Sequence, residues 1–329
     1  MSRDLCRDPP PGVQHIGFVL LPGFALMSFA AAVEPLRAAN IVAGREVYRW
    51  TSFSPSGTDA MSSSGAYVPC APLPSRHAPL HTLFVIAGGN PADWKLPGVN
   101  GCLRALARLG VRLGGISGGP YVLAAAGLLS NRRFTLHWEH APALMEAFSG
   151  LQPEPARFII DRDRLTCGGG VAPLDMMHAL IAERFGDAFA RAVSDWFLHT
   201  HVGLPSEPQR ASLAERYGVH HAALIAALEK MENTIATPLA RAAIAASAGI
   251  TPRHLDRLFA AHLGTTFSAH YRRLRLDHAR NLLRQSALSA TEIAVACGFS
   301  GGAHFARRYR AEFGVTPRAD RLRKRAMTP

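Results

Sequence analysis

Short apolar runs alternate with stretches of helical spacing through the first two-thirds of the chain. The runs that predict strands cover residues 15–21, 47–53, 82–87, 111–116, 133–135, 158–161 and 165–167. Helical spacing is found over 25–40, where Pro35 interrupts it, and over 101–109, 121–129, 175–185 and 189–201. Strands that are apolar along their whole length are typical of a parallel sheet buried on both faces. This part of the chain is therefore predicted to be an α/β domain with helices covering a parallel sheet.

The last third of the chain is helical and contains an internal repeat. Residues 244–264 and 293–314 both open with Ile-Ala, have a glycine in the middle (Gly249 and Gly298) and end at a glycine after a helical run. This pattern predicts two helix-turn-helix units in an all-α domain. An amphipathic helix over 267–288 separates them and would place both second helices on one face of a duplex. Two plain helical hairpins in a bundle remain the alternative, which arginines beside the turns disfavour.

The positive charge of the protein lies almost entirely in this helical part. Residues 1–209 contain 17 Lys and Arg against 16 Asp and Glu, whereas residues 210–329 contain 19 against 8. The net charge of +12 is thus divided as +1 and +11. A domain with such an excess is typical of a protein that binds a polyanion, so nucleic acid is the expected partner.

The cysteines and the apolar segments exclude several other classes of protein. The five cysteines are scattered and form no C-x-x-C pair, which disfavours a disulfide framework or a zinc ribbon. His77 and His81 have the spacing of a helical metal pair, but Pro79 lies between them. No signal peptide and no apolar segment long enough to span a bilayer is evident. We expect a cytoplasmic protein with no membrane partner, no metal and no cofactor.

A glycine-rich turn at 115–119 carries the chemistry of the first domain. The sequence Gly-Ile-Ser-Gly-Gly matches G-x-S-x-G on a strand-to-helix turn, which is the nucleophile elbow of serine hydrolases. Ligands of parallel sheets bind at this end of the strands. A hydrolase also needs a base, and His137, His178 and His199 lie in no recognisable motif. We therefore interpret the elbow as a ligand pocket, with a Ser117-dependent hydrolase or amidase fused to a DNA-binding module as the alternative.

Residues 13–202 resemble the PfpI-type, class I glutamine amidotransferase-like domain, which implies a flavodoxin-like fold. The similar segments are 16–23, 84–90, 115–129, 135–139 and 165–174. Catalytic members of that family have cysteine at the elbow, commonly followed by histidine, and an acidic residue near the start of the first helix. This chain has Ser117, Gly118 and Ser28 at those places, and its nearest carboxylate is Glu34. The resemblance thus implies a sensor domain without thiol chemistry, and not an enzyme.

Residues 235–322 closely resemble the AraC-type DNA-binding domain. The segments that carry this resemblance are 288–300, 304–307 and 313–318. Residues 203–234 are expected to be a linker with a connecting helix. The whole arrangement is similar to the GlxA branch of the AraC family, among regulators such as ArgR, GbdR and CdhR. The resemblance implies a ligand-responsive transcription regulator that senses an amino acid or a quaternary amine. It also implies promoter DNA as a partner, a homodimer formed through the sensor domain, and RNA polymerase as a further candidate partner.

The second helix of each helix-turn-helix unit provides the candidate DNA contacts. In the first unit, Arg253, Asp256 and Arg257 occupy positions that reach base edges, because arginine pairs with guanine and aspartate accepts from cytosine. In the second unit, Gly302 and Ala303 have no side-chain donor, so His304 and Arg307 are expected to read fewer bases. The candidates for phosphate contacts are Arg272, Arg273, Arg308 and Arg310.

The expected ligand pocket is built around the elbow. Its candidate residues are Phe24, Met27, Glu34, Asn90, Ser117, His137 and Trp138. For a quaternary ammonium ligand, Trp138 would offer an aromatic face and Glu34 a countercharge. Phe24 and Met27 could instead belong to the core, and His137 could be a structural histidine.

Overall fold

The computed structural model describes residues 12–327, with side chains described as far as Leu322, and divides them into two compact units. The division falls between Gln209 and Arg210. The segment 203–209, which we expected to be part of a linker, belongs to the first unit.

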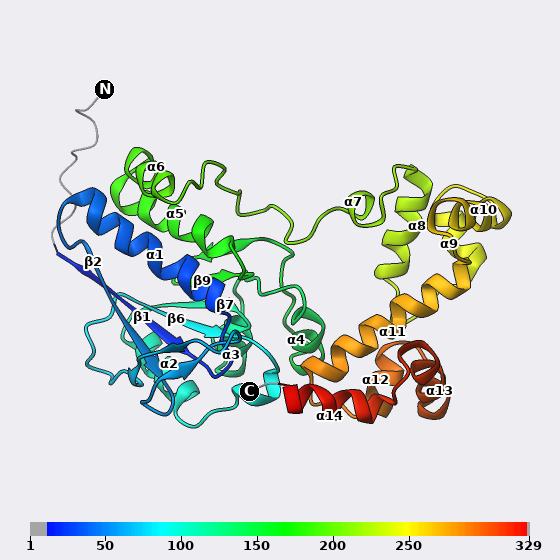
Figure 1. Cartoon of the computed structure of the whole chain (residues 1–329), viewed down its shortest axis with the longest axis horizontal. Coiled ribbons are helices and arrows are strands. Elements are labelled where there is room, and N and C mark those ends of the chain that lie inside the picture. Colours follow the sequence, from blue (N-terminus) through cyan, green and yellow to red (C-terminus); the bar gives the residue numbers. More distant parts are fainter. Residues whose placement is uncertain (1–11, 328–329) are drawn as a thin grey trace. The chain divides into compact units, whose positions relative to one another are not determined.

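A seven-stranded sheet forms the centre of the first unit (Figure 1). Its order is β5-β2-β1-β6-β7-β9-β8. The strands are β1 (Gln14–Leu20), β2 (Tyr48–Ser54), β5 (Ala71–Pro72), β6 (Thr82–Ala87), β7 (Arg112–Ser117), β8 (Phe158–Asp161) and β9 (Arg164–Cys167). All neighbours are parallel except β8 and β9, which form an antiparallel hairpin. Strands β3 (Ala60–Met61) and β4 (Tyr67–Val68) form a separate antiparallel pair. The mostly parallel sheet confirms the α/β prediction.

Helices cover both faces of this sheet. On one face lie α1 (Leu26–Ala43), α5 (Ala172–Phe185) and α6 (Asp187–Trp196), and on the other lie α2 (Val99–Arg108) and α3 (Gly119–Ala125) (Figure 1). The alternation of side chains along β1 explains the two cores: Phe18 and Leu20 pack under α1, whereas Val19 and Leu21 pack on the opposite side. The short helices η1 (Pro91–Trp94) and α4 (Ala141–Ala147) complete this unit.

Helix α1 is longer than its sequence indicated. The expected interruption at Pro35 does not end it, and Gly44 closes it in the left-handed conformation. By length and composition, α1 could cross a membrane, but it packs against the sheet, α5 and α6 as a core helix, with Leu36 and Ala39 fully buried.

The predicted strand at 133–135 is wrong. These residues pair with no strand, and two of their amides donate to side chains: Arg133 N to Asp161 Oδ2 at 3.0 Å and Thr135 N to Thr166 Oγ1 at 3.0 Å. Side-chain acceptors thus replace the strand partner that a ladder would need.

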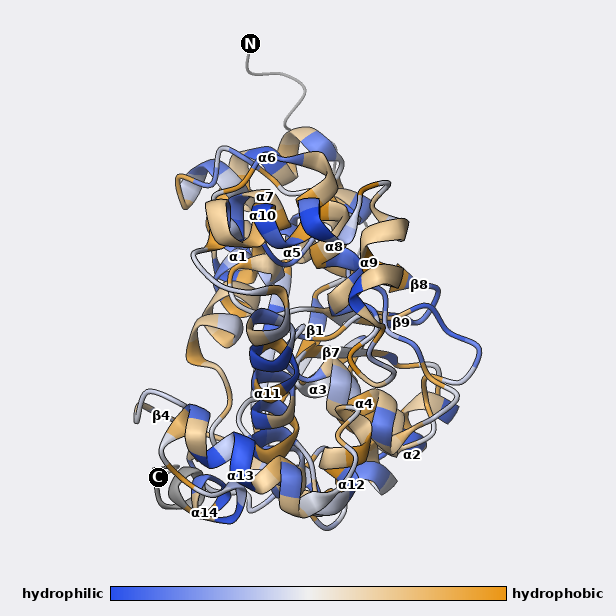
Figure 2. Ribbon diagram, turned by 90° about the vertical axis from the view of Figure 1, so that its right-hand side faces the viewer, coloured by the Kyte–Doolittle hydropathy of each residue, from blue (hydrophilic) through white to orange (hydrophobic). Residues whose placement is uncertain are grey.

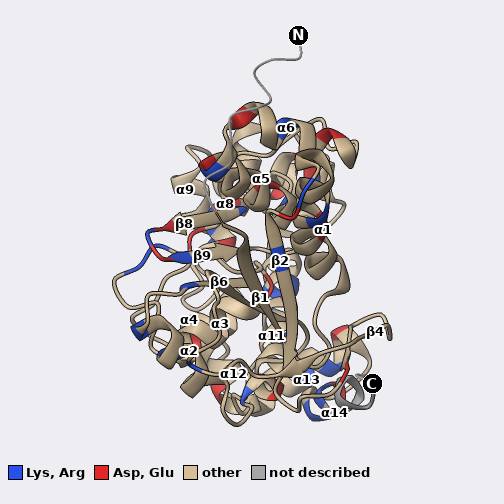
Figure 3. Ribbon diagram, turned by 90° about the vertical axis from the view of Figure 1, so that its left-hand side faces the viewer, with Lys and Arg blue, Asp and Glu red and all other residues tan. Residues whose placement is uncertain are grey.

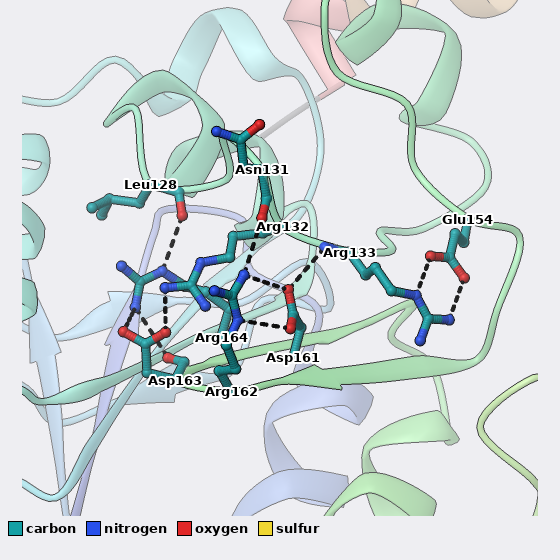
Figure 4. Close-up of polar contacts among 9 residues, drawn as sticks. All are labelled: Leu128, Asn131, Arg132, Arg133, Glu154, Asp161, Arg162, Asp163 and Arg164. Atoms are coloured by element: carbon teal, nitrogen blue, oxygen red, sulfur yellow. Dashed lines mark hydrogen bonds and ion pairs between the residues drawn. The ribbon is translucent and has the colours of Figure 1, made fainter.

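Alternating charges hold this loop to the turn of the β8–β9 hairpin (Figure 4). Asp163 pairs with Arg132 at 2.7 Å and Arg164 at 2.8 Å, and Arg133 pairs with Glu154 at 2.8 Å. Arg162 also donates to the carbonyl of Asn131. The sheet edge is therefore tied to the chain that leads away from α3.

The second unit is entirely helical. Its helices are α7 (Leu213–Tyr217), α8 (Ala222–Glu232), α9 (Arg241–Ser247), α10 (Pro252–Leu263), α11 (Phe267–Gln285), α12 (Ala290–Ala296), α13 (Gly302–Phe313) and α14 (Pro317–Met327). Helices α9 and α10 form the first helix-turn-helix unit, and α12 and α13 form the second. Hydrophilic and hydrophobic residues alternate along α11 (Figure 2). Its Tyr271 belongs to the core of the first helix-turn-helix unit, and its Leu276 and Leu282 belong to the core of the second. Helix α11 therefore joins the two helix-turn-helix units, as the sequence predicted.

The residues from Arg210 to Thr234 are not a free linker. Leu213, Leu224 and Met231 are buried in the same core as Ile244 and Phe259, so α7 and α8 are part of the helical unit. The expected linker therefore shortens, because these apolar side chains need a partner surface.

Local signals in the sequence fix the helix ends. Thr251 caps α10 by accepting from His254 N, and Ser289 and Glu292 form a capping box on α12. Gly298 has φ +68°, and a Cβ there would collide with Cδ of Pro238. The turn of the second helix-turn-helix unit thus lies directly against the segment between α8 and α9.

Candidate ligand site and nucleic-acid interface

Ser117 lies at the carboxyl end of β7 and begins a tight turn into α3. Its φ of +60° is unusual for a residue with a side chain, and its exposure is only 6%. A Cβ at Gly119 would collide with the carbonyl of Val85, so glycine is required there. The geometry confirms a strained strand-turn-helix elbow at the edge where ligands of parallel sheets bind.

The space beside Gly118, the residue after the serine, is filled by the indole of Trp94. Its Cζ2 would lie 2.5 Å from a Cβ at residue 118. Trp94 Nε1 donates to the carbonyl of Gly88 at 2.8 Å, and its ring packs edge-on against His140. A histidine at position 118 would have no room here.

A second hydroxyl lies beside the elbow in place of an acid. A Cβ on Gly169 would touch both Cβ of Ser117 and Oγ of Ser28, so these two serines flank Gly169. Ser28 is fully buried and accepts from Gly170 N at 2.9 Å. Glu34 lies further along α1 and pairs with Arg37 at 2.6 Å.

His137 lies near Ser117 but is not placed as its base. Its backbone N donates to the carbonyl of Ser117 at 3.1 Å, and its Nδ1 is 3.3 Å from Glu139 N. Burial lowers the pKa of His137 and favours the neutral ring. Within residues 12–327, Ser117 Oγ makes no hydrogen bond to an imidazole. In this arrangement His137 is therefore not positioned as a general base for Ser117.

Three apolar side chains on elements around the elbow are exposed to solvent. Met27 at the start of α1 is 62% exposed, Trp138 is 43% exposed and Val171 before α5 is 50% exposed. We call Met27, Trp138 and Val171 the rim. Val171 was missed by the sequence analysis, although it directly follows the glycine run 168–170 after β9. Exposed apolar side chains that neighbour residues of the elbow in the chain are candidates for small-molecule contacts.

Two of the expected pocket residues have structural contacts of their own. Phe24 is fully buried and packs edge-on against Phe29 at 5.8 Å, so it belongs to the core. Asn90 accepts from Ala92 N at 3.0 Å and caps η1. The structure thus brings the backbone of His137 into contact with Ser117, while Phe24 packs in the core, Asn90 caps η1 and Glu34 pairs with Arg37.

A separate cavity of about 290 Å³ lies at the opposite end of the sheet. Residues at the starts of strands line it, including Ile16, Thr82 and Arg112. Arg112 lies 3.3 Å from Glu183 on its margin. Because parallel sheets bind ligands at their carboxyl ends, we place the ligand site at the elbow and not in this cavity.

The first helix-turn-helix unit exposes two of its three candidate base contacts. Arg253 and Arg257 are exposed along α10. Asp256 pairs with Arg241 of α9 at 2.6 Å, so part of its accepting capacity is used within the unit. His254 packs edge-on against His221, which precedes α8, so its ring is engaged within the helical unit.

The second helix-turn-helix unit presents a different surface. Helix α13 begins at Gly302 and Ala303, and His304 lies against the ring of Phe299 with its Nε2 3.4 Å from Arg308 Nε. Arg307, Arg308 and Arg310 are exposed, and basic residues gather around α13 and α14 (Figure 3).

The candidate phosphate contacts on α11 differ in their pairing. Arg273 is bound to Asp277 at 2.9 Å and to Glu312 at 2.5 Å, so its charge is largely compensated. Arg272 is half-buried on the same helix. Arg272 is therefore the better phosphate candidate of the two.

Sequence analysis missed two residues that build the second unit. Arg275 donates to the carbonyls of Cys297 and Gly298 and stacks on Phe299 at 4.3 Å, so it secures the turn. Asp320 is 3% exposed and accepts from Tyr309 Oη at 2.6 Å, Arg280 at 2.8 Å and Arg284 at 3.0 Å. Burial of Asp320 opposes its ionised form, but the bonds from these three residues lower its pKa below the usual value.

An α/β domain followed along the chain by two helix-turn-helix units is the arrangement of a DNA-binding transcription regulator. Comparison with known proteins supports this class. Residues 244–323 match a family model described as a helix-turn-helix domain. The chain is 58% identical over 312 residues to the HTH-type transcriptional regulator GlxA of Rhizobium meliloti, covering 94% of this chain and 96% of the relative. It is 42% identical to the HTH-type transcriptional regulator CdhR of Pseudomonas aeruginosa, covering 96% and 95%.

Among solved structures, an AraC family transcriptional regulator from Pseudomonas putida is similar with a TM-score of 0.52 and 28% identity. The match covers 56% of this chain and 99% of that one. The chain therefore belongs to the AraC-type transcription regulators of the GlxA type and binds DNA sequence-specifically.

Proposed function

We propose that this regulator responds to a small-molecule effector that binds at the elbow. The observation that carries the proposal is the rim of Met27, Trp138 and Val171, exposed on elements around a strained serine that has no catalytic partner. A binding surface needs exposed apolar area and a few polar groups, and it needs no general base. A DNA-binding regulator with such a surface is expected to couple ligand binding to transcription.

The chemistry of the site favours an amino acid or a quaternary amine as the effector. The face of Trp138 suits a cationic or methylated nitrogen. The hydroxyl of Ser117 suits a carboxylate, because it can donate a hydrogen bond to it. Glu34 is engaged by Arg37, so the aromatic face and not this carboxylate is expected to hold the cation.

A ligand screen tests this function directly. The melting temperature of the full chain should rise with one of glycine betaine, L-carnitine or L-arginine, because a ligand that binds the native state stabilises it. Trp138→Ala should weaken that binding at least tenfold, whereas Leu109→Ala, an exposed apolar residue after α2, should not. A shift that survives Trp138→Ala would contradict an effector at the elbow.

The alternative is a Ser117-dependent hydrolase or amidase. It predicts turnover of an ester or amide panel that Ser117→Ala abolishes. The buried hydroxyl of Ser28 and the indole of Trp94 stand where an acid and a base would be needed, so we expect no turnover.

The remaining partners follow from the class of protein. We expect a homodimer formed through the sensor domain, contact with RNA polymerase at the promoter, and a cytoplasmic location. Light scattering of the full chain and of residues 1–209 would test the dimer, since both should give twice the monomer mass.

A further inference from the structure

The side chain of Gln209 fastens the end of the first unit to the loop that carries Trp138. Its Oε1 accepts from Trp138 N at 2.9 Å. Its Nε2 lies 2.9 Å from Thr135 Oγ1, 2.8 Å from the carbonyl of Leu136 and 2.7 Å from that of Ala156. The oxygen faces a donor and the nitrogen faces carbonyls, so this orientation of the amide is fixed by its partners.

The same loop touches the elbow. His137 N donates to the carbonyl of Ser117 at 3.1 Å, and the next residue, Trp138, donates to Gln209. Gly168, at the end of β9, leaves the space into which the Gln209 amide fits, because a Cβ there would lie 2.6 Å from Cδ of Gln209. Gln209 is followed directly by Arg210, the first residue of the helical unit.

A second attachment ties the beginning of this segment to α5, the helix that Val171 precedes. Asp175 is fully buried and accepts from Gly203 N at 2.9 Å, from His199 Nε2 at 2.8 Å and from Arg157 Nε at 2.9 Å. Between the two attachments, Arg157 N donates to the carbonyl of Pro205 at 3.0 Å. Both elements that bear Trp138 and Val171 are thus hydrogen-bonded to residues 203–209.

We propose that Gln209 is a positioning residue that couples the effector site to the connection with the DNA-binding unit. The inference rests on the proposed effector function and names its route. An effector that packs on Trp138 shifts the 135–138 loop, and the four contacts of Gln209 transmit that shift to residues 203–209. A bound effector also depends on Gln209, because the same amide holds Trp138 in place.

Hydrogen exchange on the full chain tests the mechanical link without any effector. Gln209→Met keeps the size of the side chain and removes its hydrogen bonds, and it should raise exchange in the peptide 135–140 about three- to tenfold. Thr135→Val, at the other end of the link, should raise exchange in the peptide 203–210. Gln152→Met is the matched control, because Gln152 is exposed on the same unit, and it should change neither peptide.

The exchange result decides the link even if a variant is less stable. Unfolding midpoints identify a variant that is globally destabilised, in which case exchange rises in all peptides. Gln209→Glu is then used as a second variant, because it places a carboxylate oxygen against the carbonyls of Leu136 and Ala156. It should give the same rise in exchange in the peptide 135–140. Unchanged exchange at 135–140 in Gln209→Met, or at 203–210 in Thr135→Val, would overturn the proposal.

The regulatory part is tested with DNA selected by the protein from a random duplex library. For the compound among glycine betaine, L-carnitine and L-arginine that binds the wild type, the ratio of DNA Kd without and with compound is measured. Gln209→Met should bring that ratio to within twofold of one, while DNA binding without compound stays unchanged. A ratio that stays at the wild-type value would overturn the coupling. If no compound binds the wild type, the proposed effector class fails, and the exchange experiment still decides the link.

Discussion

Trp94 occupies the space into which a side chain at Gly118 would extend. The indole is held by its bond to the carbonyl of Gly88 and by the ring of His140, so it cannot move aside without losing both contacts. The backbone of Gly118 has φ −78°, which any residue adopts, so only the indole restricts this position. The large side chain of Trp94 and the missing side chain of Gly118 thus distinguish this elbow from those that carry a histidine after the nucleophile.

The first prediction concerns this pair. Gly118→Ala should destabilise the first unit by about 1–3 kcal/mol, because overpacking a filled site forces its neighbours to shift. Adding Trp94→Ala should remove most of that penalty, and the double-mutant cycle in urea measures the coupling. Gly101→Ala on α2, where a Cβ meets open space, is the control. Additive effects of the two substitutions would contradict the steric account.

The second prediction separates base contacts from phosphate contacts. Arg253→Ala and Arg257→Ala should each relax specificity at one or two base pairs, since a good bidentate contact discriminates by about 1–3 kcal/mol. Arg308→Ala should weaken all sequences alike, because a phosphate contact carries no direct sequence information. Binding is measured on a series of single-base substitutions at fixed salt. A uniform loss in Arg253→Ala would place Arg253 on the backbone.

The third prediction concerns the difference between the two helix-turn-helix units. Helix α13 begins with Gly302 and Ala303, and its His304 lies against Phe299 and Arg308. The half-site under α13 should therefore tolerate base changes more than the half-site under α10, about one helical turn away. Ala303→Arg offers a gain-of-contact test, because it adds a donor at this position. Two equally specified halves in the wild type would show that α13 reads bases by other means.

The fourth prediction is a pH-dependent contribution from Asp320. Its pKa is lowered in the folded protein, so the stabilisation is complete above the unfolded value near 3.8 and is lost as the pH falls through the folded value. Asp320→Asn should cost about 3 kcal/mol at pH 7, because it removes the negative charge and one of the two acceptor oxygens that Arg280, Arg284 and Tyr309 share. The difference between wild type and variant should shrink below pH 4 in urea unfolding. Asp277→Asn, in an exposed pair with Arg273, should cost little at any pH.

The sequence predicted those features that have a local signal. The turn glycines Gly249 and Gly298 and the terminal glycines Gly264 and Gly314 mark helix ends in both helix-turn-helix units, so these elements agree within a few residues. The apolar runs marked the strands of the sheet, but residues 133–135 could not be separated from them. A segment of three residues has the same sequence pattern whether a strand or the side chains of Asp161 and Thr166 satisfy its amides.

The features that were missed depend on contacts between distant residues. Trp94, Gln209 and Asp320 find their partners through the fold, and no spacing in the chain marks them beforehand. Residues 203–234 were expected to be a linker with a connecting helix because 203–208 is rich in breakers, and the burial of Leu213 against the helical core has no such local signal. The rim was found in part: Met27 and Trp138 were predicted, whereas Val171 required the position of the α5 start.

The contact of Gly298 with Pro238 gives the helical unit a second bridge besides α11. Because α11 and this contact both connect the two helix-turn-helix units, we expect the distance between α10 and α13 to stay fixed. Inserting one base pair between the half-sites should then leave one of the two helices out of register with its half-site. The affinity should fall to that of a single helix-turn-helix unit. An allosteric signal that reaches Arg210 cannot retune this spacing. Such a signal can only change how readily the helical unit as a whole binds DNA.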